Sequence, residues 1–154
     1  MASQKILMPY NFTAYDEKAL DFVIQTFAGN KDVEITLFNA YTPIPEVDMR
    51  ESPIMEKLKN NLSLLSQKNK EQEDELRAVK QNLLQKGFSE NQVRCEFQPR
   101  KKDIAAGIIS LANNHNFNVV ILNHKPGKLS HFFTGNVFSK VVNGLKDTAV
   151  CIIS

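Results

Sequence analysis

Apolar and polar positions in the first third of the chain follow two different spacings. Residues 5–10 are a short, mainly apolar run, which is typical of a strand. Residues 15–28 repeat apolar side chains at helical spacing, and Thr13 stands where a helix N-cap belongs. Residues 34–41 are rich in β-branched and aromatic side chains. This region therefore predicts a strand, a helix and a second strand.

The next helix is predicted to be unusually long. No helix breaker separates Pro53 from Gly87, so about 34 residues could form one helix about 50 Å long. Apolar side chains fall in two stripes, within 54–65 and 76–83, and residues 66–75 between them have none. We expect this middle tract to be solvated or broken. A coiled coil or partner-binding helix is the alternative, but the missing apolar heptads favour a solvated face.

The second half of the chain continues the alternation of strands and helices. A strand is predicted at 93–97, a helix at 104–112, a strand at 119–122, a helix at 137–145 and a strand at 149–153. The continuous apolar run at 119–122 is typical of a central parallel strand covered on both faces. Strict alternation predicts an α/β fold in which one open parallel sheet carries helices on both faces, in a single domain over 1–154.

Composition narrows the class of protein. The 154 residues are 42% apolar and carry a formal net charge of +2, which fits one globular domain and argues against a dedicated nucleic-acid binder. The two cysteines, Cys95 and Cys151, fall within predicted strands, where we expect inert thiols too far apart to bond. Because no long apolar segment is present, we expect a cytoplasmic protein without a membrane span.

The segment 123–136, after the fourth predicted strand, has the richest chemistry in the chain. It contains two glycines, two lysines and two of the three histidines, and a predicted helix follows it. Ligands of doubly wound sheets bind beyond the carboxyl ends of strands, and glycines, lysines and a helix N-terminus together suit a phosphate. Turn glycines with solvated lysines are an equally good interpretation.

The same segment offers no catalytic or metal-binding set. His124 and His131 have no nearby cysteine or acid to complete a metal site, so surface or hinge histidines are expected. Ser130 beside His131 is not a triad, because adjacent side chains do not normally face each other. Asp16 and Asp103 are interpreted as helix caps. We therefore expect neither catalytic residues nor a metal site.

Three segments of the chain resemble the universal stress protein family. They are residues 6–13 with the following helix, the strand at 118–122, and 135–137 with the helix and terminal strand after it. The resemblance covers nearly the whole chain and rests on the order and spacing of these segments. It implies a sheet of order 3-2-1-4-5 and homodimers that commonly pair through the last strand. In one branch of the family it also implies ATP, bound between the loops after strands 1 and 4.

The chain departs from the pattern of the ATP-binding members at several positions. Asn11 stands at the position of their acid, and Asn123 stands at that of their first glycine. Seven residues instead of nine separate Gly127 from Gly135, and Asn136 replaces a serine or threonine. The resemblance therefore implies a degenerate nucleotide site with weak ATP binding or none.

The residues that would surround this pocket come from three loops. They are Asn11, Ala40, Tyr41, Asn123, Lys125, Gly127, Lys128, Gly135 and Asn136. Lys125 and Lys128 could compensate electrostatically for the lost hydroxyl donor. They would favour bare polyphosphate or sulfate as much as ATP, since a point charge does not recognise adenine.

Two functions follow from the resemblance. The first is a non-catalytic stress-response or interaction module, a homodimer through the final strand with an unidentified protein partner and no cofactor. The alternative is a nucleotide-responsive switch or slow ATPase, in which Asn11, Gly127, Lys128 and Gly135 still hold a phosphate. Nucleotide retained through purification, seen as absorbance at 260 nm, distinguishes them.

Overall fold

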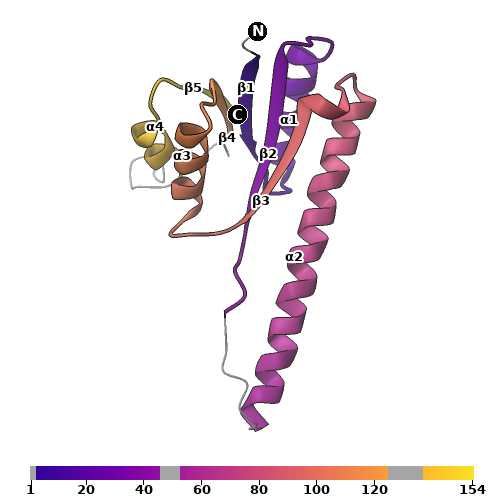
Figure 1. Ribbon diagram of the computed structural model, residues 1–154, viewed down its shortest axis with the longest axis vertical. Coiled ribbons are helices and arrows are strands. Elements are labelled where there is room, and N and C mark those ends of the chain that lie inside the picture. The colour runs from indigo at the N-terminus through magenta and orange to yellow at the C-terminus, as the bar shows by residue number, and fades with distance from the viewer. Residues whose placement is uncertain (1–2, 46–52, 125–136) are drawn as a thin grey trace.

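The computed structural model describes residues 3–45, 53–124 and 137–154 and contains one parallel five-stranded sheet (Figure 1). The strands are β1 (Gln4–Pro9), β2 (Val33–Tyr41), β3 (Val93–Pro99), β4 (Val119–Asn123) and β5 (Ala149–Ile153). The helices are α1 (Ala14–Phe27), α2 (Pro53–Gln85), α3 (Ile104–Asn114) and α4 (Val137–Gly144), and a short 3₁₀ turn, η1 (Glu90–Gln92), precedes β3. The strand order β3-β2-β1-β4-β5, with all described pairs parallel, confirms the predicted fold class.

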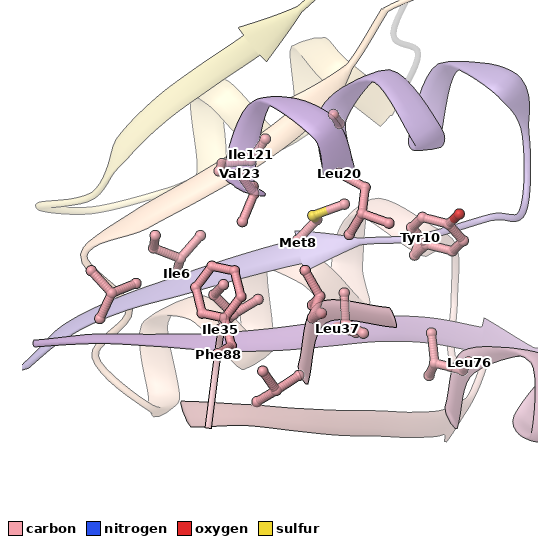
Figure 2. Close-up of a cluster of buried hydrophobic side chains, with 14 residues drawn as sticks. Ile6, Met8, Tyr10, Leu20, Val23, Ile35, Leu37, Leu76, Phe88 and Ile121 are labelled. Carbon is pink, nitrogen blue, oxygen red and sulfur yellow. The ribbon is translucent and has the colours of Figure 1, made fainter. Parts of the chain in front are cut away.

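Each face of the sheet is covered by a pair of helices. Along the central strand β1, Ile6 and Met8 point to a cluster with α1 and α2, whereas Leu7 packs with α3 and α4. Figure 2 shows the first cluster, in which Leu76 of α2 and Phe88 lie against the strands. Because β1 is buried on both faces, its apolar run is continuous rather than alternating.

Helix α2 is longer than the strands that it connects. Its 33 residues span about 50 Å, whereas the nine residues of β2 span about 30 Å. The C-terminal half packs on the sheet, with Leu76 and Leu83 fully buried, and the N-terminal half projects beyond the carboxyl edge (Figure 1). Despite this length, α2 is polar, and the helices in the described ranges include none suited to crossing a membrane.

The polar middle of α2 largely confirms one prediction, because most residues of 66–75 are exposed. Residues 66–75 are helical throughout, so the helix is not broken there. The tract is not wholly solvated either, because Asn69 is buried and its side-chain Nδ2–H donates to the carbonyl of Thr42 at 2.9 Å. The polar side chain thus holds the segment that leaves β2 against the helix.

The two cysteines lie in the opposite edge strands. Cys95 is in β3 and Cys151 is in β5, and both are half-buried free thiols, which agrees with the predicted separation. Burial raises the pKa of the Cys95 thiol, although Lys80 and Arg77 oppose the shift. The thiolate of Cys95, its reactive form, is therefore disfavoured.

Candidate functional site

The fold places a potential ligand site where β1 and β4 end side by side. In the sheet Leu7 pairs with Val120, so the two strands run in parallel toward the same edge. The chain leaves β1 toward β2 on one side, and β4 lies on the other. Such a reversal of strand order is where doubly wound sheets leave room for ligands.

A capping box closes the segment that follows β1. The N-cap Thr13 accepts the backbone N–H of Asp16 through Oγ1 at 3.2 Å. In return, the backbone N–H and the hydroxyl of Thr13 donate to Oδ2 of Asp16, at 3.0 and 2.6 Å. The prediction of Thr13 as N-cap is confirmed. Asp16 is the third helical residue of the capping box rather than the cap itself.

The second oxygen of the Asp16 carboxylate links this loop to β4. Oδ1 of Asp16 accepts a hydrogen bond from Nδ2 of Asn123, the last residue of β4. Asp16 is only 1% exposed and is the buried carboxylate among the described residues. We call this pair the Asp16–Asn123 clamp. Both oxygens of the carboxylate are engaged with side chains of the protein itself.

Sequence reasoning missed the clamp. It interpreted Asp16 as a helix cap and Asn123 as a replacement for a glycine. The available signal was that both polar residues flank the strand ends that the α/β pattern brings together. A short polar side chain on each side of that point is a reason to expect a contact.

Asn11 lies at the carboxyl edge, as predicted, and it is exposed. The next residue, Phe12, adopts a left-handed backbone with φ of 61°, which is unusual for a bulky side chain. Its ring meets that of Tyr10 edge to face, with centroids 5.3 Å apart. The aromatic contact therefore accompanies a strained turn directly after Asn11.

Tyr10 is buried, and its hydroxyl has a raised pKa. Burial raises the pKa of its hydroxyl to about 12, and the negative charges of Asp16 and Glu17 add to the shift. Neutral Tyr10 is therefore strongly favoured in the folded protein. The Tyr10 backbone N–H also continues the β1–β2 ladder by donating to Phe38 at 2.8 Å.

The end of β2 contributes a buried amide that the sequence did not reveal. Asn39 is 4% exposed and donates its Nδ2–H to the carbonyl of Tyr10 at 2.8 Å. Its Oδ1 has no hydrogen-bond partner among the described residues. The next residues, Ala40 and Tyr41, are half-buried, and the Tyr41 ring stacks on Phe97 of β3 at 4.5 Å.

The structure thus places four of the proposed pocket residues. Asn11, Asn123 and the pair Ala40 and Tyr41 stand at the carboxyl ends of the neighbouring strands β1, β4 and β2. The other five proposed residues lie outside the described residues: Lys125, Gly127, Lys128, Gly135 and Asn136.

Of the two histidines in the segment 123–136, His124 is the one within the described residues. His124 is half-buried, and its backbone N–H donates to Ile153 at 2.8 Å, which extends the β4–β5 ladder. It is therefore not the surface or hinge histidine that we expected. Ser130 and His131 lie outside the described residues. Within 3–45, 53–124 and 137–154, no cluster of three potential His, Cys, Asp or Glu ligands is present.

Solved structures of similar shape cover the whole fold. Universal stress protein UspA from Lactobacillus plantarum is 17% identical with a TM-score of 0.69, covering 100% of this chain and 99% of UspA. A universal stress protein in complex with cAMP is 15% identical with a TM-score of 0.65, covering 100% and 98%. The universal stress protein from Archaeoglobus fulgidus in complex with dAMP is 12% identical with a TM-score of 0.60, covering 100% of both chains.

Sequence identities of 12 to 17% show a shared fold, and the comparison with family models adds evidence from the sequence. No curated protein matches the sequence. The model of the Universal stress protein family matches residues 2–147, which is nearly the entire chain. The strand order β3-β2-β1-β4-β5 is the one expected from the resemblance. The chain belongs to the universal stress protein family.

Proposed function

We propose that the protein is a non-catalytic stress-response or interaction module whose nucleotide pocket is weakened. The observation that carries this proposal is the Asp16–Asn123 clamp. In this clamp, the buried carboxylate of Asp16 is engaged in hydrogen bonds within the protein. The clamp lies where the loops after β1 and β4 separate. A carboxylate with both oxygens engaged is a poor acceptor for ribose hydroxyls or an adenine amine.

The charge at the pocket supports the same conclusion. Asn11 is exposed at the end of β1 but is neutral. A hydrogen bond to a charged group contributes about 1.5 to 3 kcal/mol, which the amide does not supply. We therefore expect a dissociation constant for MgATP of about 1 mM, compared with micromolar values for a functional site.

We propose no catalytic role for the protein. General acid or base catalysis needs a titratable group that can reach a bound ligand. Asp16 is sequestered by Thr13 and Asn123, and Asp103 caps α3 while accepting a hydrogen bond from Lys140. The Lys140 hydrogen bond, together with that from the Ala106 N–H, lowers the pKa of Asp103 and keeps it ionised.

A nucleotide-responsive switch or slow ATPase is the second candidate. It is favoured by two structures of similar fold, which are universal stress proteins in complex with cAMP and dAMP. Calorimetry with MgATP, and separately with cAMP, tests the choice. A dissociation constant below about 10 μM for either ligand would replace the first proposal with the second.

A restoring variant makes the test sharper. Asn11→Asp with Asn123→Gly returns an acid and a glycine to the positions where the family resemblance expects them. We expect this double variant to bind MgATP at least about tenfold more tightly than the natural chain, a change of about 1.4 kcal/mol. Asn114→Asp, an exposed change at the end of α3, is the matched control and should leave binding unchanged. Equal affinities for the double variant and the natural chain would show that the clamp does not weaken the pocket.

The assembly proposed with this function is a homodimer through β5. Among the described strands β5 pairs on one side only, and Ile152 on β5 and Val142 on α4 are 41% and 43% exposed. An apolar edge strand is a template for pairing, which a twofold axis satisfies in both copies. We expect a dimer mass in light scattering at micromolar concentration and a monomer for Ile152→Asp. A monomeric natural chain would contradict this assembly.

A further inference from the structure

Lys140 of α4 forms an ion pair with Asp103 at the carboxyl edge of the sheet. Nζ of Lys140 donates to Oδ2 of Asp103 at 2.9 Å, and Oδ1 of the same carboxylate accepts the backbone N–H of Ala106 at 2.7 Å. Asp103 is the N-cap of α3, and Lys140 lies near the start of α4. The ion pair therefore joins the beginnings of the two helices that cover one face of the sheet.

This ion pair lies on the same face of the sheet as Ala40, one of the proposed pocket residues. Ala40 packs against the hydrophobic cluster between the sheet, α3 and α4, as do Ile104, which follows Asp103, and Phe138 of α4. Because α3 follows β3 and α4 follows β4 in a parallel sheet, both helices begin at its carboxyl edge. A ligand in the proposed pocket has these two helix starts on one side.

The helix starts around the pocket differ in charge. The first turn of α1 carries Asp16 and Glu17, whereas the first turns of α3 and α4, both within the described residues, carry no acid. Acids in a first turn repel an anion, while the positive end of a helix dipole attracts one. The anionic part of a nucleotide is therefore favoured on the side of α3 and α4. The acid on that side is the cap residue Asp103, and Lys140 balances its charge.

The ion pair keeps the Lys140 ammonium from such a ligand. The hydrogen bond from Lys140 lowers the pKa of Asp103, so the carboxylate stays ionised at neutral pH and holds the ammonium beside it. Two opposite charges at this distance present little net charge to a phosphate. Lys140 and Asp103 are 51% and 36% exposed, and an ion pair with such exposure is weak. The loss of the Asp103 charge is therefore enough to release the lysine.

We infer that Lys140 is a latent contact for the phosphate of a nucleotide, withheld from the pocket by its ion pair with Asp103. The Asp16–Asn123 clamp limits the nucleoside side of the pocket, and the ion pair limits its phosphate side. This inference rests on the weakened pocket of the proposed function. The two fail separately, because the proposed function depends on the affinity of the natural chain and the inference on a ratio of affinities between variants.

The test measures the affinity of the full chain and its variants for inorganic triphosphate by NMR titration at low salt. Asp103→Asn removes the charge that holds Lys140 and keeps an N-cap, since asparagine caps helices as well as aspartate does. We expect this variant to bind triphosphate about fivefold more tightly than the natural chain. Adenosine, which has no phosphate, should bind both chains equally, because Lys140 contacts only the phosphate.

Two further variants separate the lysine from the loss of a negative charge. Asp103→Asn with Lys140→Met is neutral at this place, like the natural ion pair, and should return triphosphate binding to the natural value. Asp147→Asn removes one exposed negative charge between α4 and β5, at the opposite edge of the sheet, and should leave binding unchanged. Asparagine tolerates the left-handed backbone of Asp147, where φ is 51°. Thermal unfolding checks that each variant keeps its fold.

Each of three outcomes would overturn the inference. The first is a gain in triphosphate affinity of less than about twofold for Asp103→Asn. The second is a gain that persists when Lys140→Met is added, since the loss of the Asp103 charge would then explain it without the lysine. The third is an equal gain for Asp147→Asn, which would reduce the effect to the net charge of the protein.

Discussion

The two halves of α2 have the same pattern of apolar positions and different environments. In the C-terminal half, Leu76 and Leu83 are fully buried, whereas Leu58, Leu62 and Leu65 on the same face of the N-terminal half are only half-buried. The difference arises from the sheet, because β2 ends beside Asn69 and the 16 helical residues before Asn69 extend about 24 Å further. An amphipathic pattern thus identifies the face of a helix that needs a partner, but not whether the same domain provides it.

The largest difference in stability is expected between leucines on the same face of the two halves of α2. Leu83→Ala empties a fully buried site and should lower the free energy of unfolding by about 3 to 5 kcal/mol. Leu58→Ala should cost less than about 1 kcal/mol, because that side chain lies outside both clusters. Urea denaturation measures both. Similar losses would mean that the projecting half is part of the cooperative domain.

A second contrast concerns buried polar groups. The body of the domain, which is the sheet with the helices packed on it, contains them, and the described residues of the projecting half do not. Asp16→Ala removes the capping box and leaves the Asn123 amide without its acceptor, so a loss of about 2 to 3 kcal/mol is expected. Asp21→Ala, an exposed change in the same helix, is the control. Urea midpoints that fall equally for both variants would remove the special role of the clamp.

The body should also respond to alkaline pH in a way that α2 does not. Burial and the charge of Asp16 raise the pKa of Tyr10 from 10.0 to about 12. A raised tyrosine pKa favours the folded state below pH 10, and this contribution disappears as the pH rises to 12. Two pKa units correspond to about 3 kcal/mol. Tyr10→Phe should flatten the decline in stability between pH 10 and 12, and an unchanged decline would contradict the assignment.

The smallest effect is expected at the border between the two halves. Asn69→Ala loses the hydrogen bond to Thr42 and should destabilise the protein by about 1 kcal/mol. Asn61→Ala, at an exposed position of the same helix, should have no comparable effect. If thermal unfolding shifts equally in the two variants, Asn69 does not anchor the segment after β2.

The elements that sequence could predict are those with a local signal. The strand at 119–122 is apolar without interruption because helices cover it on both faces, and Thr13 caps α1 through residues three positions away. The order of strands came instead from the family resemblance. Local composition alone defines a parallel sheet but not which strands are neighbours.

The features that could not be predicted depend on contacts between distant residues. Asp16 and Asn123 are 107 positions apart, so neither shows its partner in its own segment. Asn69 was interpreted as part of a solvated tract, because a buried asparagine resembles an exposed one until its acceptor, Thr42, is located. Helical spacing likewise identified the stripe at 54–65 without showing that the sheet ends beside it.

The uneven support along α2 has a consequence for the lifetimes of its backbone hydrogen bonds. Amides near Leu76 and Leu83 are sheltered by the core, so their protons exchange with deuterium mainly when the whole domain unfolds. Amides at 57–65 lie beyond the sheet, where Leu58, Leu62 and Leu65 are only half-buried, so fraying opens their hydrogen bonds without disturbing the sheet. Amide exchange along α2 is therefore expected at two rates, one set by global unfolding and the other by local opening of the helix.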